Sequence, residues 1–184
     1  MVDGEKHIIE SAIRGESEAF GLLYDGYQPQ IYRFIYLKVG HREEAEDLTH
    51  QVFVNAWQNI EKYEFRSLPF SSWLYRIARN QVVDYYRSYK GNKEQNLESI
   101  AELTANHSME LNLDTSLAFK KVQNAISELN PDYQDILIMR FTEELSLKEI
   151  AAALGKSVGA VKVAQHRALA NLKEILNESN GSTI

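Results

Sequence analysis

The sequence contains no cysteine, and only three prolines and nine glycines among its 184 residues. Without cysteine the chain cannot form a disulfide scaffold, a thiolate metal site or a cysteine nucleophile. The few prolines and glycines leave little turn punctuation, which favours long helices over a sandwich or barrel. No apolar run approaches the ~18–20 residues of a membrane span, and residues 1–10 lack the apolar stretch of a signal peptide. We therefore expect a cytoplasmic, mostly helical protein without membrane insertion of its own.

The chain is acidic overall, but its charge is unevenly distributed. It has 26 acidic and 20 basic residues, a net charge of −6. Residues 73–93 nevertheless hold five basic residues against one acidic residue, and residues 156–173 hold four basic residues and no acidic one. Residues 94–114 hold five acidic residues and no basic one. Two basic segments separated by an acidic one predict two anionic contact sites on one chain.

Apolar residues recur with helical spacing through residues 1–90, which we assign to a first helical domain. The predicted elements are a short helix closed by Gly15, helices over 20–40 and 42–60, an ordered loop over 63–72, and a helix over 72–89 capped by Ser71 or Ser72.

Residues 91–115 combine asparagine, serine and scattered acids with few apolar side chains, which predicts a flexible acidic linker. A second compact helical domain is expected over residues 116–180. Its first apolar stripe consists of Ala118, Val122, Ala125, Ile126 and Leu129. Its predicted caps are Asn130 before Pro131, Ser146 in a capping box with Glu149, and Ser157 before the last helix. The fold class is therefore all-α, with two small helical domains and a linker.

Residues 147–167 match the spacing of a helix-turn-helix. Ala151 is small where two helices must cross closely, Gly155 can take the left-handed conformation of the turn, and Val161 anchors the second helix. The residues expected to face DNA are Ser157, Ala160, Lys162, Val163, His166 and Arg167. An ordinary helical hairpin with a solvated face is the alternative, but an acid-free basic helix favours DNA binding.

The helix over 72–89 carries a second basic stripe, formed by Arg76, Asn80, Val83, Arg87 and Lys90. The aromatic residues around it are Tyr63, Phe65, Phe70, Trp73, Tyr75, Tyr86 and Tyr89. Basic side chains follow phosphates and aromatic faces stack on unpaired bases, so this mixture suits single-stranded or opened DNA. The equally weighted alternative is that most aromatics, Trp73 in particular, are core and the bases form a solvated stripe.

The acids Glu43, Glu46 and Asp47 near the start of the 42–60 helix also have two interpretations. The helix macrodipole alone explains them, and a basic protein partner explains them equally well. No Gly-rich phosphate loop, nucleophile elbow or catalytic carboxylate pair is present, and the five histidines lack metal-ligand spacing. We therefore expect no enzymatic active site, no metal and no cofactor.

These segments together resemble a known family. Residues 45–48, Phe53 and residues 56–57, followed by residues 73–80 and Asp84, resemble region 2 of bacterial extracytoplasmic-function (ECF) RNA polymerase sigma factors, group IV of the primary sigma family. Residues 145–172, including Gly159 to Lys162 and His166 to Ala168, resemble their region 4. The match covers nearly the whole chain in the family's order, with its two domains and linker.

The resemblance implies a promoter-specificity subunit of RNA polymerase. Region 2 would dock on the clamp helices of the largest polymerase subunit through Glu43, Glu46, Asp47 and Gln51. The −10 element would be captured and opened by Phe65, Arg66, Phe70, Trp73, Arg76, Arg79, Asn80, Val83 and Arg87. Region 4 would read the −35 element and meet the polymerase flap region. Family members are commonly held inactive by an anti-sigma factor.

The recognition helix departs from the family pattern. It has Ala164 and Leu169 where arginines are often found, and Val163 in place of a small polar residue. An apolar Val163 suits contact with a thymine methyl group. The alternative function is a helix-turn-helix regulator that is not a polymerase subunit, and a third is a helical adaptor for an acidic protein.

Overall fold

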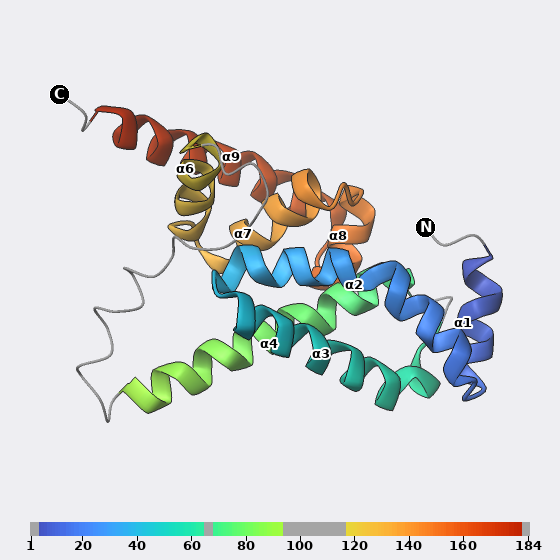
Figure 1. Ribbon diagram of the computed structural model, residues 1–184. Coiled ribbons are helices and arrows are strands. Elements are labelled where there is room, and N and C mark those ends of the chain that lie inside the picture. Colours follow the sequence, from blue (N-terminus) through green and yellow to red (C-terminus); the bar gives the residue numbers. More distant parts are fainter. Residues whose placement is uncertain (1–3, 65–67, 94–116, 182–184) are drawn as a thin grey trace. The chain divides into compact units, whose positions relative to one another are not determined.

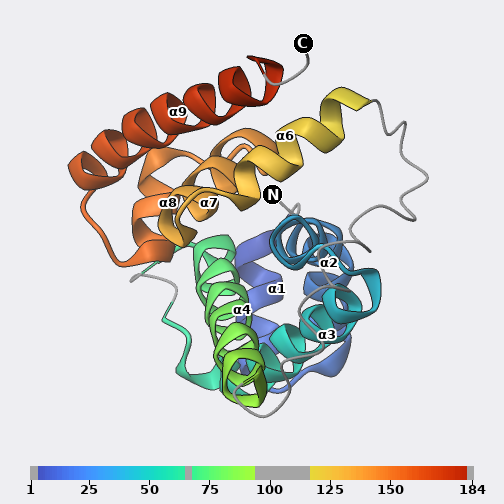
Figure 2. The same ribbon diagram turned by 90° about the vertical axis from the view of Figure 1, so that its left-hand side faces the viewer.

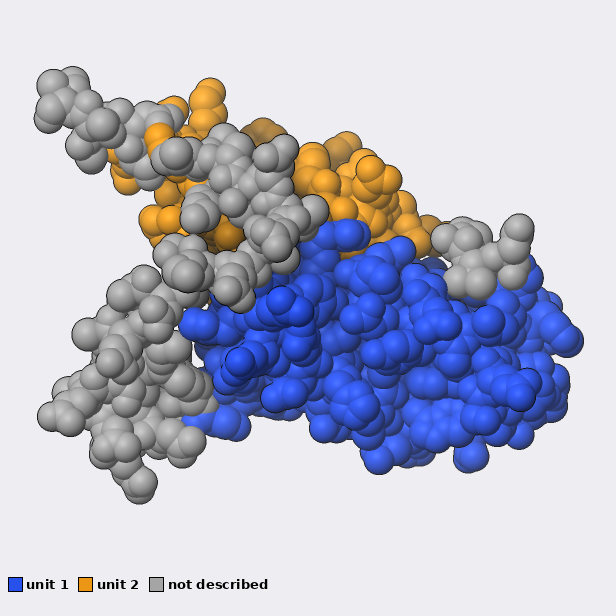
Figure 3. Space-filling model, viewed as in Figure 1, with its two compact units in different colours: residues 1–89 blue, residues 90–184 orange. Residues whose placement is uncertain are grey.

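The computed structural model describes residues 4–64, 68–93 and 117–181, and these ranges contain helices and no strand. The chain divides into two compact units, residues 1–89 and residues 90–184 (Figure 3). Each unit is built around its own buried apolar residues. The helices of the described ranges confirm the predicted all-α fold.

The described residues of unit 1 form four α-helices and one 3-10 turn, and the last helix continues past residue 89 (Figure 1). They are α1 (Glu5–Ile13), α2 (Ser17–Val39), α3 (Arg42–Asn59), η1 (Ile60–Lys62) and α4 (Phe70–Lys93). Helix α2 packs against both α1 and α3. Helix α2 also contacts α4: the ring centroids of Phe34 and Tyr75 lie 5.4 Å apart. In addition, the Tyr86 hydroxyl donates a hydrogen bond to the Lys38 carbonyl oxygen at 2.6 Å.

Glycine ends the first helix of unit 1, as the sequence predicts. Gly15 has a φ of +88° and donates its N–H to the Ala12 carbonyl at 3.0 Å. The N–H of Glu16 reaches the Ser11 carbonyl at 3.1 Å, which completes a Schellman motif. This tight ending turns the chain back so that α1 packs on α2.

The predicted start of α4 is wrong. The helix begins at Phe70, and the Trp73 N–H donates a hydrogen bond to the Pro69 carbonyl at 3.0 Å. Ser72 is buried within the first turn and does not cap it. At its other end α4 continues to Lys93, so residues 91–93 are helical where the sequence predicts linker. The remaining linker residues, 94–115, lie outside the described residues.

Within residues 117–181, unit 2 consists of α6 (Leu117–Ser127), α7 (Pro131–Leu137), the short π-helical turn η3 (Ile138–Thr142), α8 (Leu147–Leu154) and α9 (Val158–Gly181). Helix α9 packs against α6, α7 and α8 (Figure 2). One buried cluster is formed by Leu129, Leu137 and Ala168, with Tyr133, Leu172 and Ile175 against it. Val122 of the predicted α6 stripe is instead 40% exposed, so that stripe is only partly buried.

All three caps predicted for unit 2 are confirmed. The Asn130 side chain accepts the Tyr133 N–H at 3.0 Å. Ser146 Oγ accepts the Glu149 N–H at 3.2 Å, and the Glu149 carboxylate accepts the Ser146 N–H at 2.9 Å. Ser157 Oγ accepts the Ala160 N–H at 3.1 Å, so α9 begins where the sequence places it.

Candidate nucleic-acid interfaces

Helices α8 and α9 form the predicted helix-turn-helix. Gly155 ends α8 in the left-handed conformation with a φ of 63°. The next residue, Lys156, donates its N–H to the Ala151 carbonyl at 2.9 Å. Ile150, Ala151 and Val161 are buried, so α8 and the first turns of α9 are held together by the small and apolar residues expected at the crossing.

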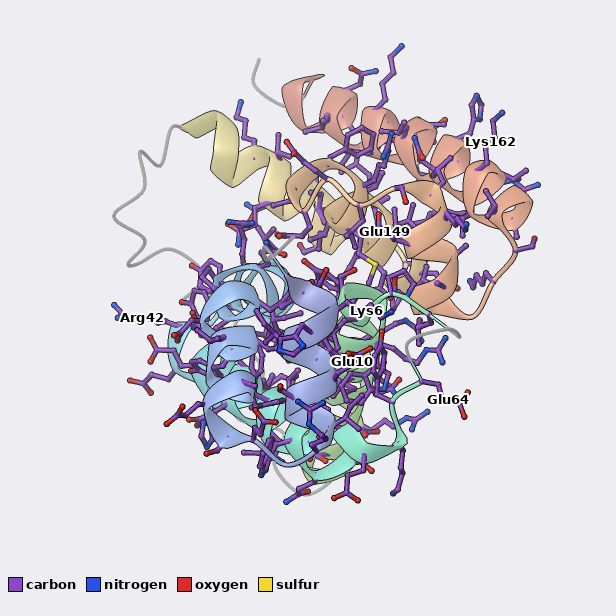
Figure 4. All side chains as sticks on the ribbon, turned by 90° about the vertical axis from the view of Figure 1, so that its right-hand side faces the viewer. Lys6, Glu10, Arg42, Glu64, Glu149 and Lys162 are labelled. Atoms are coloured by element: carbon purple, nitrogen blue, oxygen red, sulfur yellow. The ribbon has the colours of Figure 1, made fainter. Side chains whose placement is uncertain are left out.

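The outer face of α9 presents the predicted DNA-facing residues. All six are exposed: Ser157, Ala160, Lys162, Val163, His166 and Arg167. Figure 4 shows Lys162 on the outer side of α9. Ser157 also caps the helix, which ties its hydroxyl to the backbone. An exposed, acid-free face on the second helix of this motif has the form that fits a DNA major groove.

Lys156 has a different environment from the other bases of this segment. Its ammonium group forms an ion pair with the carboxylate of Asp132 at the start of α7. This pair joins the turn of the helix-turn-helix to the rest of unit 2. Part of the positive charge counted between residues 156 and 173 is therefore neutralised within the unit.

Four of the five residues of the predicted basic stripe on α4 can be placed, and the side chain of the fifth, Lys90, lies outside the described part of the structure. Arg76, Asn80 and Arg87 are exposed, while Arg79 and Val83 are half-buried. Asp84 lies 3.4 Å from the Arg87 guanidinium, a distance that allows a weak, solvent-exposed pair. The stripe therefore offers positive charge along one side of α4, with its predicted neighbours Phe65 and Arg66 outside the described residues.

The aromatic residues beside this stripe are largely core, and this corrects the predicted role of Phe70. Phe70 is only 2% exposed, with its ring 5.5 Å from Tyr27 and 5.4 Å from Tyr63. Trp73 is half-buried against Tyr63 and Phe70 at 5.1 and 5.5 Å. Phe70 thus has no free face on which a base could stack, because its ring is buried within unit 1. Trp73, by contrast, is partly exposed at the surface.

Tyr63 completes this aromatic cluster. Its hydroxyl donates a hydrogen bond to the Leu68 carbonyl at 2.7 Å, which ties the start of the loop to the residues before α4. Burial, with a smaller contribution from the carboxylate of Glu5, raises the pKa of Tyr63 to about 12. The phenol is therefore neutral at physiological pH and acts as a structural donor.

The acidic face of α3 is exposed, as the docking interpretation requires. Glu43, Glu46, Asp47 and Gln51 lie on its surface, above the buried Ala45, Thr49 and Val52. Arg42 Nε contacts Glu46 Oε1 at 2.8 Å, and Arg42 lies at the outside of the unit (Figure 4). Burial, followed by the charge of Glu46, raises the pKa of the neighbouring Tyr32. The face remains acidic despite the Arg42 pair, because Glu43 and Asp47 flank it.

Phe141 is an exposed apolar residue that the sequence reasoning missed. Phe141, in the π-helical turn η3, is 57% exposed. Glu144, two residues after the end of this turn, has a φ of 56°, and Arg140 Nη1 donates to the Leu145 carbonyl at 2.8 Å. A π-helical turn has no simple residue signature, so spacing alone does not show that Phe141 points outward.

No metal or membrane site emerges in the described ranges. No group of three His, Asp or Glu side chains there is arranged to hold a metal ion. No described helix has the length and apolar character needed to cross a membrane.

Two protein-family models match the chain. The model for Sigma-70 region 2 matches residues 23–91, and that for Sigma-70 region 4 matches residues 119–172. Among curated proteins, the ECF RNA polymerase sigma factor SigW of Bacillus subtilis is 30% identical over 182 residues, which cover 94% of this chain and 97% of SigW. The ECF RNA polymerase sigma factor BldN of Streptomyces coelicolor is 36% identical over 170 residues, 92% of this chain but 64% of BldN.

Solved structures share the fold. CnrH, determined in complex with the cytosolic domain of CnrY, matches with a TM-score of 0.72 at 22% identity over 95% of this chain and 97% of CnrH. The sigma factor RpoE of Bartonella quintana, determined with the anti-sigma factor NepR, matches with a TM-score of 0.66 at 21% identity over 86% of this chain and 96% of RpoE.

Proposed function

Because the chain belongs to the extracytoplasmic-function family of RNA polymerase sigma factors, we propose that it binds core RNA polymerase, recognises the −10 and −35 promoter elements and directs transcription initiation. The observation that carries this proposal is the match to SigW, which spans 94% of this chain and 97% of that relative. A match of this extent includes both helical units. The chemistry of RNA synthesis then belongs to the polymerase, and this chain supplies recognition in the cytoplasm.

The exposed acids of α3 support a docking surface for the polymerase. Glu43, Glu46 and Asp47 present negative charge on one side of the helix. Such a face complements a basic surface such as that expected of the clamp helices of the largest subunit, and complementary charge orients the partners. Gln51 extends the same face toward the middle of α3.

The two basic surfaces support contacts with DNA. On α4, Arg76 and Arg87 are placed to follow phosphates near the −10 element, and Trp73 offers the partly exposed ring of that surface. On α9, the exposed face is placed to enter the major groove at the −35 element. Two DNA-binding surfaces in separate units match a protein that contacts two promoter elements at once.

Two protein partners follow from the family. We assign the polymerase flap region to unit 2, where the exposed Phe141 offers an apolar anchor distinct in sequence from the DNA-facing residues of α9. An anti-sigma factor is a further partner: RpoE of Bartonella quintana was determined with the anti-sigma factor NepR. A protein of this class would block activity by covering the polymerase-docking or DNA-binding surfaces.

A binding experiment tests the proposal. The full chain should retain core RNA polymerase in a pull-down, and the double variant Glu46→Lys, Asp47→Lys should weaken this binding by at least tenfold, because each reversal places like charges at the interface. The circular dichroism spectrum should stay unchanged, since both residues are exposed. Reversal of Glu18 and Asp25 on α2, also exposed, is the matched control.

The alternatives give different outcomes in the same experiment. A regulator that is not a polymerase subunit would bind promoter DNA alone and leave core polymerase unbound. A helical adaptor would bind neither. If the Glu46, Asp47 variant binds core polymerase as well as the unmodified chain does, α3 is not the docking surface.

A further inference from the structure

The middle of the exposed face of α9 is apolar, although this helix is proposed to meet DNA. Val163 is 52% exposed. Its neighbours on the helix surface, three and four residues away, are Gly159, Ala160, His166 and Arg167. On the side toward the turn, Val163 is thus bordered by nothing larger than a methyl group. On the other side it is bordered by the basic residues.

Gly159 has no role within the unit that requires a glycine. Its φ is not among the positive values found at Gly15, Gly40 and Gly155. A Cβ atom added at Gly159 would meet no described atom within 4 Å. Glycine in a helix is less favourable than alanine, since it loses more backbone entropy on folding. A glycine that neither the backbone nor the packing demands leaves room for an outside surface to come close to the helix.

These two features combine at the first turns of α9, the part of a recognition helix that enters the groove. Among the four bases, only thymine carries a methyl group on its major-groove edge, and apolar side chains recognise it. Lys162, His166 and Arg167 provide the polar and charged contacts around the apolar centre. A valine without polar atoms distinguishes thymine from the other bases through this methyl group alone.

Resting on the proposed function, we propose that Val163 reads the methyl group of one thymine in the −35 element, and that Gly159 lets the first turn of α9 approach the bases closely. The site therefore recognises a thymine-containing sequence by apolar contact at its centre, with polar and charged contacts at its sides. The arginines often found in related helices at the positions of Ala164 and Leu169 are not required for this contact.

Replacement of thymine by deoxyuridine tests the methyl contact, because it removes only that group. The full chain bound to core RNA polymerase is first used to select promoter DNA from a random library. Each thymine of the selected −35 element is then replaced singly by deoxyuridine. At one position the affinity should fall about fourfold, the effect of losing one buried methyl group. The variant Val163→Ala should bind the thymine and deoxyuridine forms equally.

Matched variants separate this contact from general effects. Val122→Ala removes a valine of similar exposure from α6 and should keep the fourfold preference for thymine. Gly159→Ala should weaken binding several-fold while the melting temperature stays equal or rises by a few degrees. Gly21→Ala on α2 is its control, since an added Cβ there also meets nothing within 4 Å, and it should leave the preference for thymine and the −35 affinity unchanged.

Three results would overturn the proposal. Specific −35 binding with no deoxyuridine effect at any position would exclude a methyl contact, and the proposed function would stand. A deoxyuridine effect that persists in Val163→Ala would show that another residue contacts the thymine methyl group. Unchanged DNA binding by Gly159→Ala would contradict the proposal that the first turn of α9 approaches the bases closely. Absence of any sequence-specific binding by the polymerase complex would instead contradict the proposed function.

Discussion

The two surfaces that we propose for DNA binding in this sigma factor are built in different ways. On α9 the exposed residues are set by local signals: a cap at Ser157, a left-handed glycine at Gly155 and a buried anchor at Val161. On α4 the exposed residues are determined by tertiary packing, because an aromatic cluster buries Phe70 in the core. The first surface can be deduced from neighbouring residues, whereas the second depends on contacts between distant segments.

The aromatic cluster of unit 1 draws its members from three places in the chain. Tyr27 lies on α2, Tyr63 follows η1, and Phe70 and Trp73 begin α4. Ring pairs of this kind stabilise a core beyond the area that they bury. The cluster therefore fixes where α4 starts, and with it the position of the basic stripe.

The largest expected effect comes from removing the centre of this cluster. Phe70→Ala should lower the free energy of unfolding by about 3–5 kcal/mol, because a buried ring is lost and a cavity remains. Arg76→Ala, which removes an exposed side chain of the same helix, should change it by less than about 0.5 kcal/mol. Urea denaturation followed by tryptophan fluorescence reports unit 1, since both tryptophans, Trp57 and Trp73, lie there. A loss below about 1 kcal/mol for Phe70→Ala would mean that the ring is not core.

The next effect concerns DNA binding by α9. Arg167→Ala or His166→Ala should each cost about 1–3 kcal/mol at one promoter position and relax specificity there, if that side chain reads a base edge. Lys162→Ala should weaken binding to all sequences and reduce the salt slope by about 1, as expected of a phosphate contact. Salt-dependent binding of the polymerase complex to −35 variants measures both. Wild-type affinity, salt slope and preference in all three variants would show that α9 does not read DNA.

A smaller effect tests the local signals of unit 2. Ser146→Ala removes one half of the capping box at the start of α8 and should lower stability by about 1 kcal/mol. Ser88→Ala, at an exposed position within α4, is the control and should have little effect. Thermal unfolding followed by circular dichroism compares the two. Equal melting temperatures would indicate that the cap contributes nothing to unit 2.

A further effect, confined to alkaline solution, is a pH dependence in unit 1. Because the pKa of Tyr63 is raised to about 12 in the fold, the neutral phenol is favoured there. The stabilisation is complete below the ordinary tyrosine pKa of about 10 and is lost as the pH rises toward about 12. Tyr63→Phe should lack this loss, so the stability difference between the two proteins should shrink between pH 9 and pH 11.5. Parallel stability curves over this range would contradict a buried, hydrogen-bonded phenol.

The sequence predicts the fold class, the helix-turn-helix and the N-caps at Asn130, Ser146 and Ser157, because caps and left-handed glycines act through residues a few positions away. It does not predict that α4 begins at Phe70, since the carbonyl of Pro69 and the contacts with Tyr27 and Tyr63 decide this. The outward position of Phe141 also escapes prediction, because it depends on a π-helical turn. Residues whose exposure depends on tertiary packing are thus the ones that local patterns misplace.

Promoter-directed transcription tests the central claim most directly. Core RNA polymerase is supplied with the full chain and a library of promoter fragments, and the transcripts are identified by their start sites. We predict defined start sites only when both components are present, and their loss in the Glu46→Lys, Asp47→Lys variant. Defined initiation by core polymerase without the chain, or no initiation on any fragment with it, would contradict the assignment of this protein as a promoter-recognition subunit.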